Sequence, residues 1–136
     1  MQRGSDYIMK ENTRFYICPV CGKVVGLIND TDVPTICCGE EMQLLEANTT
    51  DAALEKHVPV YTVDEQEGEI VVNVGSVDHP MEKEHYIMWV AQVSENTTTR
   101  VRLLPEQAPV AKMKHIKGAT LFAYCNKHGL WMKNLD

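Results

Sequence analysis

The chain has 136 residues and a formal net charge of -6, with 44% hydrophobic and 24% charged residues. This composition is typical of a folded globular protein and excludes a disordered one. The acidic balance argues against a nucleic-acid surface, and no apolar run reaches membrane-spanning length, so neither a nucleic acid nor a membrane is an expected partner. The start of the chain lacks the apolar core of a signal peptide, and we expect a cytoplasmic protein.

Residues 1–13 are polar and are predicted to be a flexible lead-in. The segment F-Y-I-C-P-V-C-G over residues 15–22 then predicts a short strand that runs into a metal-binding knuckle. In a C-x-x-C-G knuckle, backbone N–H groups turn towards the first sulfur, and the glycine takes the left-handed conformation that the tight turn requires. Further strands are predicted over residues 24–28 and 40–45.

Four of the five cysteines lie in the first third of the chain, in two pairs. Two pairs of thiolates predict a tetrahedral site for iron or zinc. Two redox disulfides are the alternative, which a reducing cytosol disfavours. A unit this short buries too little apolar surface to fold unaided, so the ion would supply much of its stability. The four residues are Cys18, Cys21, Cys37 and Cys38.

Small polar residues at 47–51 predict a domain boundary, with a metal module over 1–46 and a second domain over 47–136. Thr50 or Asp51 is expected to cap a short helical turn through residues 52–54. After that the chain shows short strands, turn signals and no helix period, which indicates an antiparallel sandwich or barrel. The fold class is therefore all-β. The expected strands are 58–63, 69–74, 86–93, 98–104, 110–116, 120–124 and 130–133.

A cysteine and a histidine stand three positions apart in a predicted tight turn near the C-terminus, Cys125 and His128. At this spacing both side chains can reach one metal ion. A lone C-x-x-H is a weak signal, because a small buried hydrophobe and a solvated turn residue would give the same pattern.

Three further histidines fall at predicted strand ends or loops, where a sandwich clusters its functional groups: His57, His79 and His85. His115 lies in a basic run and is expected at the surface. Zinc is usually satisfied by four ligands. Four imidazoles and one thiolate make five, a set that suits iron with one coordination position left open for a reaction.

Several motifs, in this order, resemble the desulfoferrodoxins, which are two-iron superoxide reductases: C-P-V-C-G, C-C-G, E-K-H-V-P-V, H-P-M-E-K-E-H-Y-I-M-W and Y-C-N-K-H-G-L-W. The resemblance covers residues 15–133. It implies a desulforedoxin-like module with iron held by the four paired cysteines, zinc being the alternative ion. It also implies an immunoglobulin-like β-sandwich with a second iron. There His57, His79, His85 and His128 would form a square plane and Cys125 would be the axial ligand.

The activity that the resemblance implies is superoxide reduction, in which one electron from Fe²⁺ and two protons convert superoxide to hydrogen peroxide. It further implies a rubredoxin-like electron donor and a homodimer. Glu55 and Lys56 would be catalytic: the ammonium would attract superoxide, and the carboxylate would fill the vacant position on Fe³⁺. The alternatives are that Glu55 is a solvated loop carboxylate and that Lys56 is a surface ammonium, without a role in the reaction.

Two other functions stay open on the sequence alone, a non-catalytic iron electron carrier and a zinc-binding structural module. Aromatic residues flank the expected ligands and are interpreted as core packing rather than as electron relays: Tyr86, Trp89, Tyr124 and Trp131.

Overall fold

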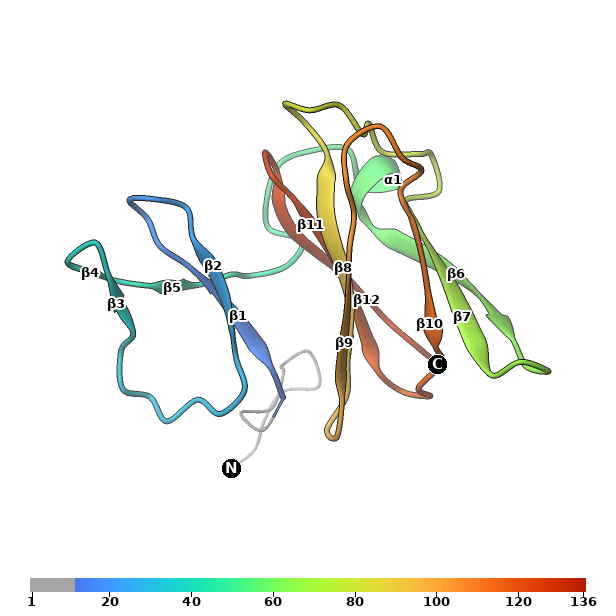
Figure 1. Ribbon diagram of the computed structural model, residues 1–136, viewed down its shortest axis with the longest axis horizontal. Coiled ribbons are helices and arrows are strands. Elements are labelled where there is room, and N and C mark those ends of the chain that lie inside the picture. The colour runs from blue at the N-terminus through green and yellow to red at the C-terminus, as the bar shows by residue number, and fades with distance from the viewer. Residues whose placement is uncertain (1–11) are drawn as a thin grey trace. The chain divides into compact units, whose positions relative to one another are not determined.

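The computed structural model describes residues 12–136 (Figure 1). The lead-in expected over residues 1–13 therefore lies outside the described residues up to residue 11. The chain divides into two compact units, Met1–Leu45 and Glu46–Asp136. Both are built from strands, and the predicted all-β class is confirmed. Within the described part of the chain, no helix is both long and apolar enough to cross a membrane.

The N-terminal unit contains a three-stranded sheet and a separate hairpin. The sheet has the order β2-β1-β5, and β3 pairs with β4. The predicted strand over 24–28 is present and ends one residue early, whereas the strand predicted over 40–45 forms as two strands of two residues each. The bounds are β1 Arg14–Ile17, β2 Val24–Leu27, β3 Ile36–Cys37, β4 Glu40–Glu41 and β5 Gln43–Leu44.

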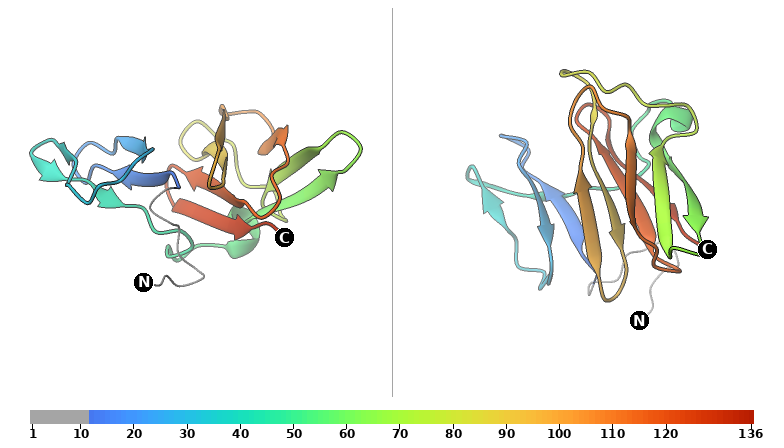
Figure 2. Two further views of the ribbon diagram at one scale, coloured as in Figure 1. Left: turned by 90° about the horizontal axis from the view of Figure 1, so that it is seen from below. Right: turned by 45° about the vertical axis from the view of Figure 1, so that its right-hand side comes forward.

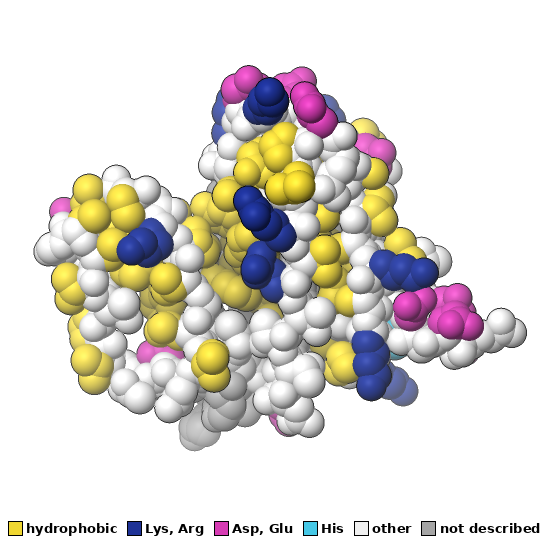
Figure 3. Space-filling view, in the orientation of Figure 1, with side chains coloured by type: hydrophobic (Ala, Val, Ile, Leu, Met, Phe, Trp, Pro, Cys, Tyr) yellow, Lys and Arg dark blue, Asp and Glu magenta, His cyan; other side chains and the backbone are white. Residues whose placement is uncertain are grey.

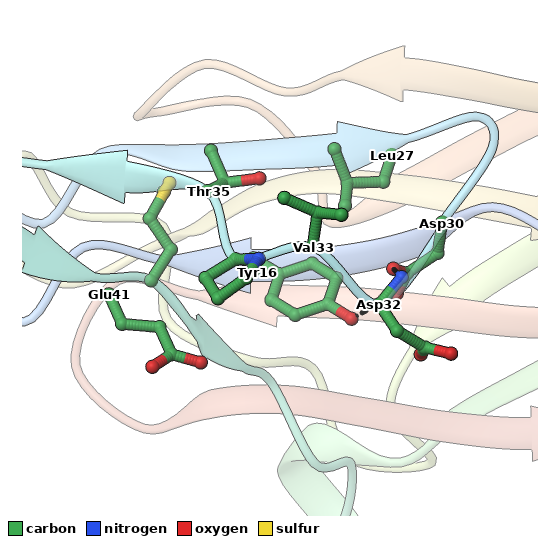
Figure 4. A pocket seen from close by; sticks show the side chains of 9 residues that line it. Tyr16, Leu27, Asp30, Asp32, Val33, Thr35 and Glu41 are labelled. Carbon is green, nitrogen blue, oxygen red and sulfur yellow. Dashed lines mark hydrogen bonds between the residues drawn. The ribbon is translucent and has the colours of Figure 1, made fainter.

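Few apolar side chains are buried in this unit: among its described residues these are Phe15, Cys18 and Met42. A polar contact closes the long 28–35 loop instead, because the hydroxyl of Tyr16 donates to the carboxylate of Asp30. Figure 4 shows these two side chains at the edge of a pocket of about 200 Å³. None of the four cysteines lines the pocket.

The C-terminal unit is an immunoglobulin-like sandwich of two antiparallel sheets, as predicted (Figure 2). One sheet has the order β10-β7-β6 and the other β12-β11-β8-β9. The seven predicted strands are all present, with ends that shift by up to two residues. Their bounds are β6 Pro59–Asp64, β7 Glu69–Val74, β8 Ile87–Val93, β9 Thr98–Arg102, β10 Val110–Lys114, β11 Thr120–Cys125 and β12 Gly129–Asn134.

The hydrophobic core lies between these two sheets. Along β7 buried and half-buried residues alternate, so Ile70, Val72 and Val74 face the core. The central strand β11 is buried along its whole length. Gln92 is a buried polar residue on β8. Its amide donates to the carbonyl of Lys114, the last residue of β10, at 2.7 Å and accepts from the N–H of Ile116 at 2.9 Å. A buried polar group needs such partners, and this one joins the two sheets.

The short helix differs from its prediction. α1 spans Leu54–His57, two residues later than the expected turn, and its N-cap residue is Ala53, without a side-chain cap. The expected caps Thr50 and Asp51 lie too far upstream. The helical turn is instead closed at its end, where the N–H of Val58 donates to the carbonyl of Leu54 at 2.9 Å. This shift places a histidine at the last position of the helix.

Candidate metal centres

The four paired cysteines converge in the N-terminal unit and form what we call the four-cysteine centre. Their sulfurs lie within 4.8 Å of one another. The sulfurs of Cys21 and Cys37 are 3.8 Å apart, and those of Cys37 and Cys38 are 3.9 Å apart. These distances match a tetrahedral metal site, in which four sulfurs about 2.3 Å from one ion lie about 3.8 Å apart. All five cysteines are free, so the alternative with two disulfides is not observed.

Two tight turns produce this convergence. At the first, the N–H groups of Val20 and Cys21 both approach the sulfur of Cys18 at 3.4 Å, as expected for the knuckle, and Gly22 has a φ of 79°. At the second, Cys38 and Gly39 are the two central residues of the β3–β4 hairpin, and both have positive φ. A two-residue turn with positive φ at both positions matches the twist of a hairpin.

The protonation of the thiols reflects the same contacts. The N–H of Cys21, with help from that of Val20, lowers the pKa of Cys18 to about 6. Hydrogen bonds that the Cys37 thiol donates to the sulfurs of Cys18 and Cys21 favour its protonated form and raise its pKa to about 12. Binding of a metal requires thiolates and would displace these protons.

The second centre lies at one end of the sandwich. Figure 1 shows α1, the loop between β7 and β8, and the β11–β12 turn gathered there. Ligand atoms from five residues on these segments lie within 4.8 Å of one another. We call this set the histidine–cysteine centre. The set is the one that the sequence predicted, and His115 is not part of it: His57, His79, His85, Cys125 and His128.

The four imidazoles form a closed ring of neighbours. Each ring meets the next nearly edge to face, at centroid distances of 4.5 to 5.0 Å and interplanar angles of 75° to 88°. The order around the ring is His79, His57, His128, His85. Nε2 of His57 lies 3.0 Å from Nε2 of His79 and 3.2 Å from Nδ1 of His128. Two nitrogens about 2.1 Å from one ion at right angles would be about 3.0 Å apart.

Backbone carbonyls orient two of these rings. Nδ1 of His57 bonds the carbonyl of Ala53 at 2.7 Å, and Nδ1 of His79 bonds that of Pro80 at 2.6 Å. A carbonyl accepts, so each ring carries its proton on Nδ1 and offers the Nε2 lone pair to the cluster. Nε2 of His85 is buried and has no hydrogen-bond partner in the described protein. An unpaired buried nitrogen aimed at such a cluster fits a metal ligand.

Burial keeps these side chains uncharged. It lowers the pKa of His57 and His85 and lowers that of His79 to about 4, so these three imidazoles are neutral at pH 7. Burial also raises the pKa of the Cys125 thiol, against hydrogen bonds from the N–H groups of Lys127 and His128. Neutral imidazoles are ready to bind a metal, whereas the thiol would lose its proton to the ion.

The β11–β12 hairpin aims its two ligands by local geometry. The pairing of β11 with β8 shifts register between Tyr124 and Cys125, a bulge of the kind that redirects a side chain. Gly129 closes the three-residue loop with a φ of 79°. A Cβ on Gly129 would also lie 3.2 Å from the hydroxyl of Thr50.

Asn126 and Trp131 have roles that the sequence analysis missed. The amide of Asn126 accepts from the N–H of Tyr86 and donates to the carbonyl of Glu84, both at 3.0 Å, and so binds the two neighbours of His85. The ring of Trp131 stacks on His57 at 4.7 Å. Its indole N–H donates to the carbonyl of His128 at 3.1 Å. The only signal was position, since both lie within three residues of a predicted ligand.

Two of the other flanking aromatics pack against each other. Trp89 and Tyr124 are opposite each other on β8 and β11, and their rings stack at 5.5 Å with an interplanar angle of 12°.

Glu55 and Lys56 lie on α1 and are exposed, directly before the buried His57. Their charges act on the imidazole of His57 in opposite directions.

Comparisons with known proteins match both units. The model of the desulfoferrodoxin family matches residues 49–134, and that of the desulfoferrodoxin N-terminal domain matches residues 10–45. A desulfoferrodoxin of Syntrophotalea carbinolica is 41% identical over 124 residues, which are 90% of this chain and 97% of that protein. The chain therefore belongs to the desulfoferrodoxin family, and the resemblance seen in the sequence is confirmed.

Solved structures agree with this assignment. The superoxide reductase from Treponema pallidum is similar with a TM-score of 0.70 and 30% identity, over 89% of this chain and 98% of that one. A superoxide reductase (neelaredoxin) from Archaeoglobus fulgidus is similar with a TM-score of 0.50 and 32% identity, over 65% of this chain and 94% of that one.

Proposed function

We propose that the protein is a superoxide reductase, which converts superoxide to hydrogen peroxide at an iron ion in the histidine–cysteine centre. The observation that carries the proposal is the closed ring of four imidazoles with the Cys125 thiol beside it. The solved structures similar to this chain include proteins named superoxide reductase.

Iron is the ion we propose for both centres, with zinc as the alternative in the four-cysteine centre. Structural zinc sites are usually complete with four ligands, so the five donors of the second cluster favour iron. Iron bound there would supply one electron to superoxide. The spacing of the nitrogens and the unpaired Nε2 of His85 support a metal at this position.

The surrounding residues would set the charge of the site. Neutral imidazoles leave the charge of Fe²⁺ intact, and the Cys125 thiolate lowers it to a net +1. The site would therefore attract a small anion, although the chain carries a formal charge of -6. At physiological salt, charges beyond about 8 Å are largely screened, so nearby groups decide the attraction. We propose that Lys56 adds to this attraction and that Glu55 occupies the open position after oxidation.

A pulse of superoxide mixed with the reduced protein tests the proposed activity. We expect one-electron oxidation of the histidine–cysteine centre, with one hydrogen peroxide formed and no oxygen released. An electron carrier would not react with superoxide, and a structural zinc module would be colourless. Either result would contradict the proposal.

Lys56→Ala tests the role of the ammonium. We expect the bimolecular rate with superoxide to fall about threefold to tenfold at low salt, and its salt dependence to flatten, because a local attraction is lost. The control is Lys114→Ala, which makes the same change in net charge at the last residue of β10, opposite Glu69 on β7. Equal rates for the two variants would remove Lys56 from the mechanism.

Three further features are proposed with the function. A small rubredoxin-like protein would supply the electrons, and the reducing cytosol would keep the five cysteines free.

The N-terminal unit would form a homodimer. Figure 3 shows hydrophobic side chains on the surface of this unit, and Val20, Ile28, Val33 and Ile36 are 60 to 83% exposed. Sedimentation at equilibrium would give the mass of one chain if the dimer is wrong.

A further inference from the structure

The turn that follows β7 packs against the backbone of α1. The carbonyl of Glu55 accepts from the N–H of Val77 at 2.9 Å and from the hydroxyl of Ser76 at 3.3 Å. We call this turn the 73–78 turn, because it includes the last two residues of β7, and His79 follows it directly. One short segment therefore carries one histidine of the cluster and holds the carbonyl two residues before another, His57.

Gly75 makes this close approach possible. A Cβ at this position would lie 2.6 Å from the carbonyl oxygen of Glu55, 2.9 Å from that of Val58 and 3.0 Å from the carbonyl carbon of Lys56. All three atoms belong to the backbone of α1 and its C-cap, so no side chain can rotate away to make room. Any other residue at 75 would force the helical turn and the 73–78 turn apart.

The 73–78 turn is itself braced, and α1 is therefore the part expected to move. The amide of Asn73 donates to the carbonyl of Gly75 at 2.8 Å and to the carboxylate of Asp78 at 2.9 Å. The N–H of His79 donates to the carbonyl of Val74 at 2.9 Å and closes the turn. The N–H of Val74 bonds the carbonyl of Pro109, which joins the turn to the β9–β10 connection.

We propose that the 73–78 turn holds α1 in place, a role we call the seat of α1. Gly75 is then a positioning residue, which sets the positions of Glu55, Lys56 and His57 at the cluster. The inference concerning Glu55 and Lys56 rests on the proposed function; that concerning His57 rests on geometry alone. The 3.0 Å between Nε2 of His57 and Nε2 of His79 leaves little tolerance for a shift of α1.

Iron release from the full-length, iron-loaded protein tests the seat. A ferrous chelator is added to the reduced protein, and its coloured complex is followed over time. We expect Gly75→Ala to lose the iron of the histidine–cysteine centre at least tenfold faster than wild type. The four-cysteine centre, in the other unit, should lose its metal ion at the wild-type rate, and its metal content serves as an internal control.

The matched variant is Gly68→Ala. Gly68 lies in the β6–β7 turn with a φ of 68°, and a Cβ there meets nothing within 4 Å. Alanine at 68 strains its own turn and lowers the melting temperature without touching the cluster, so iron release should stay within twofold of wild type. Gly75→Ala with a release rate within twofold of wild type, or no faster than Gly68→Ala, would overturn the proposal.

If Gly75→Ala does not fold, iron release from Asn73→Ala tests the proposal instead. It removes the two side-chain bonds that brace the turn and adds no atoms. We expect iron release to accelerate about threefold to fivefold, and an unchanged rate would contradict the seat.

Coupling to Lys56 is tested by the rate of the superoxide reaction at low salt in the single and double variants. If Gly75 acts through α1, the double variant Gly75→Ala/Lys56→Ala should be no slower than the slower single variant, whereas independent effects would multiply. Iron release needs no superoxide, so a protein without reductase activity would refute the proposed function and still report on the seat.

Discussion

The two candidate metal centres are built in opposite ways. The cysteines of the N-terminal unit come as two local pairs on tight turns, in a unit with three buried apolar residues among those described. The ligands of the C-terminal unit are spread from residue 57 to residue 128 and meet at the end of a sandwich with a core of its own. We therefore expect the N-terminal unit to depend on its ion for much of its stability, and the sandwich to depend on its own hydrophobic core.

Removal of the metal ions should produce the largest difference between the two units, in the protection of their backbone amides. In chelator-treated full-length protein we expect amide protection to be lost throughout β1–β5, by at least a hundredfold, because the ion replaces a core there. Protection in β7, β8 and β11 should persist, because their burial needs no ion. Hydrogen exchange read by mass spectrometry measures both regions at once, and equal loss in both would refute the contrast.

Acid should destabilise the metal-free sandwich. The pKa of His79 is lowered from 6.5 to about 4, and burial lowers those of His57 and His85 in the same direction. Below pH 6.5 these imidazoles bind protons in the unfolded chain, whereas in the folded unit they stay neutral to a lower pH. The free energy of unfolding is therefore full above pH 6.5 and falls as the pH drops towards 4, by up to about 3 kcal/mol from His79.

Urea unfolding at pH 7.5, 5 and 4 measures this change. Both tryptophans lie in the C-terminal unit, so their fluorescence reports on that unit alone. His79→Gln should flatten the dependence, and a wild-type protein whose stability is constant between pH 7.5 and 4 would show that the imidazoles are not desolvated.

Asn126→Ala should weaken the preformed centre. Both exposed hydrogen bonds from its amide to the segment around His85 are lost, and each contributes about 0.5–1.5 kcal/mol. We expect iron to leave the histidine–cysteine centre about tenfold faster in a chelator assay, with the four-cysteine centre unaffected. Asn96→Ala, in the exposed β8–β9 turn, is the control, and the same acceleration there would contradict the role.

Trp131→Phe should have the smallest effect. Phenylalanine keeps a ring beside His57 but loses the indole N–H that bonds the carbonyl of His128, worth about 1 kcal/mol. Iron release should accelerate about fivefold beyond the change caused by Trp89→Phe, which also shortens a buried tryptophan but stacks on Tyr124 and not on a ligand imidazole. Equal release from the two variants would mean that Trp131 only fills space.

Most strands could be predicted because their signals are local. Alternation and turn residues predicted β7 with its observed bounds, and the other strands of the sandwich to within two residues. The helical turn was placed two residues early, because the prediction relied on Thr50 and Asp51 as caps while the structure uses no side-chain cap. What holds α1 is the 73–78 turn, which is distant in sequence and leaves no local signal.

The sequence by itself determined the two cysteine pairs, the antiparallel all-β class and the four histidines and Cys125 as candidate ligands, because residue type, short spacing and strand patterning are written along the chain. The choice of a sandwich over a barrel came from the family resemblance. The tertiary structure decided the order of the imidazoles around the ring and which nitrogen each presents. It also decided the contacts of Gly75, Asn126 and Trp131 with the ligand segments. These depend on carbonyls and packing brought together from distant segments, where geometry rather than residue type carries the information.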